Sequence, residues 1–149
     1  MGYGQTMNAY SVYRETGVRT ASQGKLIVML YDEAVRQLNY SLSYISENNK
    51  VETPYIEQFS KHIQKVQEII TELMVGLDME AGGDIAKNLM SLYIFFNQEL
   101  LSISISHNRK KIIFIHDMMS QLRDAWVEAA SSAGQSPAPA SYARIDING

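Results

Sequence analysis

The side chains that could perform chemistry in this chain of 149 residues are three histidines and a set of carboxylates, because there is no cysteine. A di-iron site in a helical bundle needs Glu-x-x-His pairs that project inward. The residues three positions before His62, His107 and His116 are phenylalanine, serine and isoleucine, so this motif is absent. The lack of cysteine also excludes disulfides, thiolate zinc sites and cysteine nucleophiles. The sequence therefore predicts neither a metal nor another cofactor.

The carboxylates and glycines do not form a catalytic pattern either. Asp32-Glu33 lies near the surface boundary of a predicted helix, and Asp78 falls in a predicted loop, where it can brace a turn. Gly82-Gly83 precedes a helix but lacks the lysine and the spacing of a phosphate-binding loop. Because no nucleophile and base can be paired, we expect a protein that is not an enzyme.

The composition is that of one globular domain, with 46% hydrophobic and 19% charged residues. A net charge of -3 offers no electrostatic footprint for nucleic acid. No apolar run approaches the roughly 20 residues that span a bilayer, and the N-terminus has no secretory signal pattern. We therefore expect a cytoplasmic protein without nucleic-acid binding or membrane insertion.

Helical periodicity predicts an all-α fold. Four segments, 22–47, 53–77, 84–106 and 109–130, repeat apolar residues at about 100° per residue and are separated by short breaks. Thr53 is the expected N-cap of the second segment, with Pro54 at its first helical position. Together the segments predict an antiparallel four-helix bundle over 22–130. We expect an N-terminal helical arm over 1–21 and a disordered tail over 131–149, which is rich in small and polar residues.

Two helices carry more apolar surface than one core needs. Besides its core positions, the first has a second cluster of Leu26, Met29, Tyr40 and Tyr44, and the third has a second stripe of Met90, Ile94, Leu101 and Ile105. Three interpretations stay open: helices buried on two sides, a homodimer interface, or grooves for a partner's helix.

The N-terminal arm adds a second apolar feature. Tyr10 and Tyr13 lie three residues apart in a segment too short to be a stable helix alone. We expect the arm to lie over an apolar groove, either as a lid that a ligand displaces or as a clamp that holds it.

Three blocks of residues carry a family signature. They read NAYSVYRETGVRTASQGKLIVMLYD over 8–32, ITELMVGLDMEAGGDIAKNL over 70–89 with Leu92-Tyr93 after it, and LRDAW over 122–126. In this order they resemble the flagellar export chaperone FliS family. Gln23 departs from the pattern, which usually has proline there, and a helix can begin without it.

This resemblance implies a small helical bundle that binds the C-terminal region of flagellin in the cytoplasm. It implies that the chaperone prevents premature polymerisation and delivers flagellin to the flagellar type III export apparatus without nucleotide or metal. The implied partners are flagellin, the export-gate component FlhA and, in some relatives, an anti-sigma factor. The alternative from another class is a dimeric helical adaptor or regulatory protein without a flagellin client.

The residues that we expect to bind flagellin combine the matched blocks with the second apolar stripes. They are Tyr10, Tyr13, Leu26, Ile27, Met29, Leu30, Tyr31, Leu77, Met79, Met90, Tyr93, Ile94, Leu101 and Ile105.

Overall fold

The computed structural model describes residues 21–133, and four long helices make up most of this range. They are α2 (Ala21–Ser43), α3 (Ile56–Val75), α4 (Gly83–Ser106) and α5 (Arg109–Ala133), with a short 3-10 turn, η1 (Thr53–Tyr55), before α3. The only pairing of strand type among these residues is an isolated antiparallel bridge between Ile45 and Val51. The predicted all-α bundle is therefore confirmed.

The expected arm and tail fall almost entirely outside the described residues. At the two boundaries the structure differs slightly from expectation. Ala21, placed in the arm, is the first residue of α2, and residues 131–133, placed in the tail, belong to the last turn of α5.

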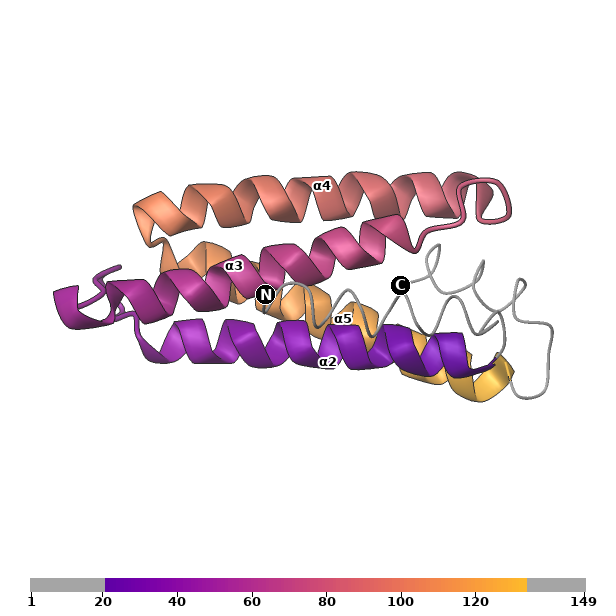
Figure 1. The fold of residues 1–149 in the computed structure, drawn as a ribbon, viewed down its shortest axis with the longest axis horizontal. Coiled ribbons are helices and arrows are strands. Elements are labelled where there is room, and N and C mark those ends of the chain that lie inside the picture. Colours follow the sequence, from indigo (N-terminus) through magenta and orange to yellow (C-terminus); the bar gives the residue numbers. More distant parts are fainter. Residues whose placement is uncertain (1–20, 134–149) are drawn as a thin grey trace.

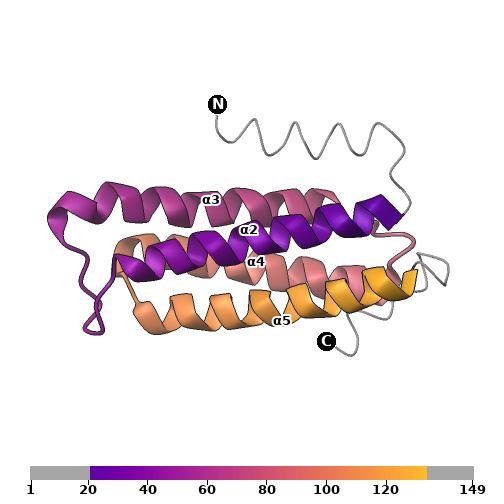
Figure 2. The same ribbon diagram turned by 90° about the horizontal axis from the view of Figure 1, so that it is seen from below.

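Each helix runs antiparallel to the one before it, as the two ribbon views show (Figures 1 and 2). Helix α2 packs against α3 and α5, and α4 packs against the same two helices from the other side. Helices α2 and α4 therefore occupy diagonal corners of the bundle. The seam between α4 and α5 has the fewest contacts of the four lateral seams, so α4 is held mainly by α3.

The core follows the periodicity of the sequence. On α4, the apolar residues that recur at helical spacing on the inner face are buried, except Leu92, which is partly exposed; the buried ones are Ile85, Leu89, Phe96, Leu100 and Ile103. The hydroxyl groups of Tyr31 on α2 and Tyr93 on α4 share a hydrogen bond inside the bundle. This bond joins the two diagonal helices and gives both phenol oxygens a partner in a region without bulk water.

The helix ends are set by local polar contacts. Thr53 does not cap a helix as expected; it is the first residue of η1, and α3 begins only at Ile56. Glu52 takes the N-cap position instead, and Pro54 lies in the first turn of η1, where its missing N–H costs no intrahelical hydrogen bond. Helix α4 ends at Ser106. The N–H of His107 still donates to the carbonyl of Ile103 at 2.8 Å, and the left-handed backbone of His107 (φ 54°) then turns the chain out of the helix.

The two loops at one end of the bundle are tied together by Asn49. Its backbone is left-handed (φ 63°), and its side-chain oxygen accepts a hydrogen bond from the N–H of Arg109 at 2.9 Å. At the other end, the Asp78 carboxylate accepts hydrogen bonds from the N–H groups of Glu80 and Ala81 at 3.1 and 2.9 Å. Asp78 therefore braces the α3–α4 turn, which is the structural role that the sequence suggested.

Candidate functional site

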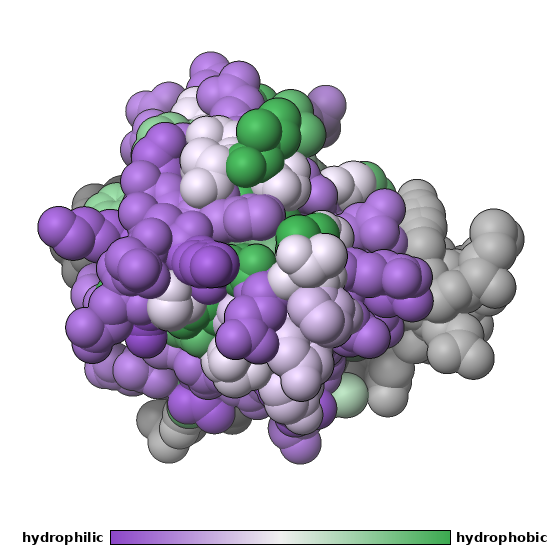
Figure 3. All heavy atoms as spheres, turned by 90° about the vertical axis from the view of Figure 1, so that its left-hand side faces the viewer, coloured by the Kyte–Doolittle hydropathy of each residue, from purple (hydrophilic) through white to green (hydrophobic). Residues whose placement is uncertain are grey.

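Among residues 21–133, a stripe of exposed apolar side chains lies on the outer face of α4. Ile94, Leu101 and Ile105 are 42%, 61% and 80% exposed, and Met90 is partly exposed beside them. Their spacing places them on one face of the helix, opposite Phe96 and the rest of the core. We call this set the α4 stripe. Figure 3 looks at the end of the bundle where α4 terminates, and hydrophobic atoms stand out at the level of α4 within a mainly hydrophilic surface.

Folding does not explain the α4 stripe. An apolar side chain contributes about 25 cal/mol for each Å² that it removes from water, and these three side chains keep much of their surface in water. The contribution becomes available when another molecule, or a segment of this chain outside residues 21–133, covers them. The stripe is therefore suited to binding an apolar face of a partner, as the sequence suggested for these residues.

The second cluster expected on α2 is only partly exposed. Met29 and Tyr40 are 59% and 47% exposed, and Tyr44 is partly buried. Leu26 is 5% exposed and belongs to the core, so its placement on an outer cluster was wrong. A helical angle alone does not show that a neighbouring element covers this position.

The other expected site residues divide between core and surface. Four of them are buried, namely Ile27, Leu30, Tyr31 and Tyr93, so in this conformation a ligand cannot lie directly against them. Leu77 is partly buried at the end of α3, and Met79 is 40% exposed in the α3–α4 loop. Tyr10 and Tyr13 lie outside the described residues.

The sequence reasoning missed one apolar feature, at the seam between α4 and α5. Phe95 and Phe114 are 41% and 50% exposed, and their rings meet edge to face with centroids 6.5 Å apart. They line an open hollow of about 280 Å³ together with Glu99, Lys110 and Lys111. The available signal was the apolar run 112–115, which is longer than one core-facing stripe requires.

The three histidines each have a structural contact. The ring of His107 meets Phe59 edge to face at 5.1 Å, and His116 lies 3.0 Å from the Asp117 carboxylate on its own helix. Between residues 21 and 133, no three His, Asp or Glu side chains are grouped so that they could hold a metal ion. Over the same part of the chain, no helix is long and apolar enough to cross a membrane.

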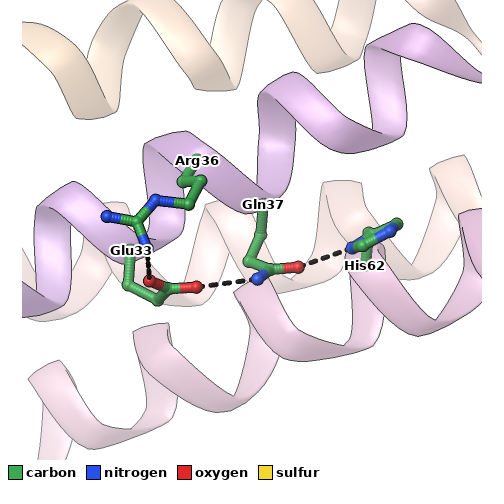
Figure 4. A network of polar contacts seen from close by, with 4 residues as sticks. All are labelled: Glu33, Arg36, Gln37 and His62. Carbon is green, nitrogen blue, oxygen red and sulfur yellow. Dashed lines mark hydrogen bonds and ion pairs between the residues drawn. The ribbon is translucent and has the colours of Figure 1, made fainter.

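His62 takes part in a polar chain between α2 and α3, drawn in Figure 4. The Glu33 carboxylate accepts hydrogen bonds from Arg36 at 2.8 Å and from the Gln37 amide nitrogen at 2.7 Å. The Gln37 amide oxygen lies 2.6 Å from Nδ1 of His62, so this ring nitrogen is the donor. Partial burial, and then the positive charge of Lys65, lower the pKa of His62 below its ordinary value.

This shift predicts a pH-dependent contribution to stability. A histidine in the unfolded chain takes up a proton near its ordinary pKa of about 6.5, before His62 does so in the folded protein. The contribution is therefore present above that pH and is lost as the pH falls through the lower, folded-state pKa. In urea unfolding at about pH 7.5 and about pH 5.5, His62→Gln should show a smaller loss of stability on acidification than the wild type. His116→Gln is the control for loss of a histidine elsewhere, and an unchanged loss in His62→Gln would contradict the prediction.

Comparison with known proteins identifies the family of this chain. Residues 6–133 match the family model described as "Flagellar protein FliS". The chain belongs to the FliS family. The match includes all four described helices of the bundle and ends at Ala133, where α5 ends.

Curated FliS relatives agree with this assignment, and each is described as "Flagellar secretion chaperone FliS". The protein from Salmonella typhimurium is 30% identical over 80% of this chain and 84% of its own length. The Campylobacter jejuni protein is 29% identical over 80% of this chain and 89% of its own length. The Bacillus subtilis protein is 23% identical over 84% of this chain and 88% of its own length. FliS is a family of flagellar secretion chaperones, which confirms that the protein is not an enzyme.

Proposed function

We propose that this FliS-family protein binds the C-terminal region of flagellin in the cytoplasm, prevents its premature polymerisation and delivers it to the flagellar type III export apparatus. The α4 stripe is the observation that carries this proposal. Ile94 and Ile105 are separated by 11 positions, or about 17 Å along a helix. This length matches roughly three turns of an amphipathic helix laid against α4.

The physical basis is competition for an apolar face. Flagellin subunits assemble by packing apolar surfaces of their terminal regions, so a chaperone that covers such a surface lowers the concentration of assembly-competent subunits by mass action. Ordering a disordered client on the chaperone opposes binding by several kcal/mol. The resulting moderate affinity suits a client that must be released for export.

Delivery requires a contact that distinguishes loaded from empty chaperone. We include the export-gate component FlhA as the receiving partner, because a chaperone that bound the gate equally well when empty would occupy it without cargo. An anti-sigma factor is a further partner in this proposal. The α4 stripe is proposed as the flagellin site only, and no residue is assigned to FlhA or to the anti-sigma factor.

Light scattering of the purified protein with flagellin tests the proposal. We expect a monomer that forms a one-to-one complex with intact flagellin and no complex with flagellin lacking its C-terminal segment. A constitutive dimer that is indifferent to flagellin would contradict the proposal and favour the alternative, a dimeric helical adaptor. Equal binding to intact and truncated flagellin would contradict only the part of the proposal that places the bound segment in the C-terminal region of flagellin.

A further inference from the structure

The α4–α5 seam carries a second apolar surface that is separate from the α4 stripe. Phe95 projects from the side of α4 that faces α5, whereas Ile94 and Leu101 project from its outer face. Phe114 completes the hollow from α5. Both phenylalanines remain about half exposed, and the backbones of α4 and α5 approach each other less than those of the other lateral helix pairs. The hollow can therefore accept a bulky apolar side chain without displacing a core residue.

The side chains that line this hollow carry more positive than negative charge, with Lys110 and Lys111 against Glu99. Helix α5 opens with three consecutive cations, Arg109, Lys110 and Lys111, and has no acidic residue in its first turn. Lys111 is paired with Glu99 at 3.3 Å, whereas Lys110 is exposed and makes no ion pair with any residue between 21 and 133. Cations at a helix N-terminus are unfavourable, because that end of the helix dipole is already positive. A carboxylate placed beside Lys110 would relieve this arrangement.

We infer that the hollow formed by Phe95, Phe114 and Lys110 is a second docking site, and that its occupant is an acidic amphipathic segment of a partner protein. A bulky apolar side chain of this segment lies in the open hollow against the two phenylalanine rings, and a carboxylate one helical turn away pairs with Lys110. Charge complementarity selects this occupant over a neutral or basic one. The inference goes beyond the proposed function, since it needs neither flagellin nor the α4 stripe.

A pair of synthetic helical peptides tests the charge requirement. The probe is a fluorescein-labelled peptide of about 18 residues with leucine at i, i+3, i+4 and i+7 and glutamate on the remaining positions. The control peptide has lysine in place of every glutamate. Because the whole protein is negative, with a net charge of -3, overall charge would favour the basic peptide. We expect the acidic peptide to bind at least about tenfold more tightly, as measured by fluorescence anisotropy.

Substitutions locate the binding. Lys110→Glu should weaken the acidic peptide by about tenfold or more, whereas Lys65→Glu, the same charge change on α3, should leave its affinity within about twofold. Phe114→Ser should also weaken binding of the acidic peptide, whereas Leu101→Asp should leave this binding unchanged. Circular dichroism melting of each variant ensures that the bundle is folded. In NMR spectra of the protein titrated with the acidic peptide, the backbone amide signals that shift should belong to residues 95–99 and 108–118.

Two outcomes would overturn the inference. One is equal or tighter binding of the basic peptide. The other is binding that Leu101→Asp removes and Lys110→Glu leaves intact, because this would place the peptide on the α4 stripe. Failure of flagellin to bind the protein would leave these measurements unaffected, so the two proposals fail separately.

Discussion

On the proposed function, replacing Leu101 with aspartate will strongly weaken flagellin binding while the bundle stays folded. Leu101 lies at the centre of the α4 stripe and is 61% exposed, so a carboxylate at this position stays hydrated in the free protein. When an apolar helix covers it, the carboxylate loses water and gains no partner, which costs several kcal/mol. We expect a loss of affinity of about 100-fold or more by titration calorimetry, with a melting temperature near that of the wild type.

The neighbouring leucine is the matched control. Leu100 has no exposed surface, and Leu100→Asp would bury an unpaired charge in the core. This variant should lose on the order of 4–5 kcal/mol of stability and unfold or lose its cooperative transition. If Leu101→Asp binds flagellin normally, the α4 stripe is not the client site. If it unfolds as Leu100→Asp does, the outer face of α4 contributes to the fold.

The second large effect concerns two adjacent phenylalanines with opposite environments. Phe96 is fully buried, and truncating it to alanine removes most of a side chain from the closely packed core. Such truncations cost about 3–5 kcal/mol, because the lost transfer free energy is increased by the cavity that remains. Urea unfolding of Phe96→Ala, followed by far-ultraviolet circular dichroism, should show this loss as a large fall in the transition midpoint.

Phe95→Ala is the comparison for that measurement. Its ring is 41% exposed and contacts Phe114 across the α4–α5 seam, so we expect a loss of about 1 kcal/mol or less. Similar losses for the two variants would mean that the seam is as closely packed as the core. That result would also argue against an open hollow beside Phe95 and Phe114 that a partner side chain could enter.

The four helices and most of the core could be predicted because helical periodicity is a local property of the sequence. A residue such as Phe96 repeats with Leu89 and Leu100 on one face, and the face with the most apolar residues turns inward in water. The same reasoning identified Ile94, Leu101 and Ile105 as a separate face. Their exposure depends on no neighbour lying over them, and a helical angle does not contain that information.

Leu26 and Phe95 show where this reasoning fails. Leu26 lies away from the main arc of its helix and is nevertheless buried, whereas Phe95 lies beside a core residue and is exposed. Both outcomes depend on how closely a second element approaches. Helices α4 and α5 approach each other less than the other lateral pairs do. The distance between them is set by the packing of the whole bundle. The expected cap at Thr53 was also wrong, because a short 3-10 turn with Glu52 at its N-cap position precedes α3, and Pro54 is compatible with either start.

The α4 stripe also has a consequence for the solubility of the protein. An apolar strip on a small domain promotes self-association, and the repulsion between negatively charged molecules opposes it. The net charge is only -3 and the isoelectric point is about 5.6, so mild acidification removes this repulsion while the strip remains. We therefore expect the free protein to self-associate on mild acidification, and we expect a partner that covers the strip to reduce this self-association.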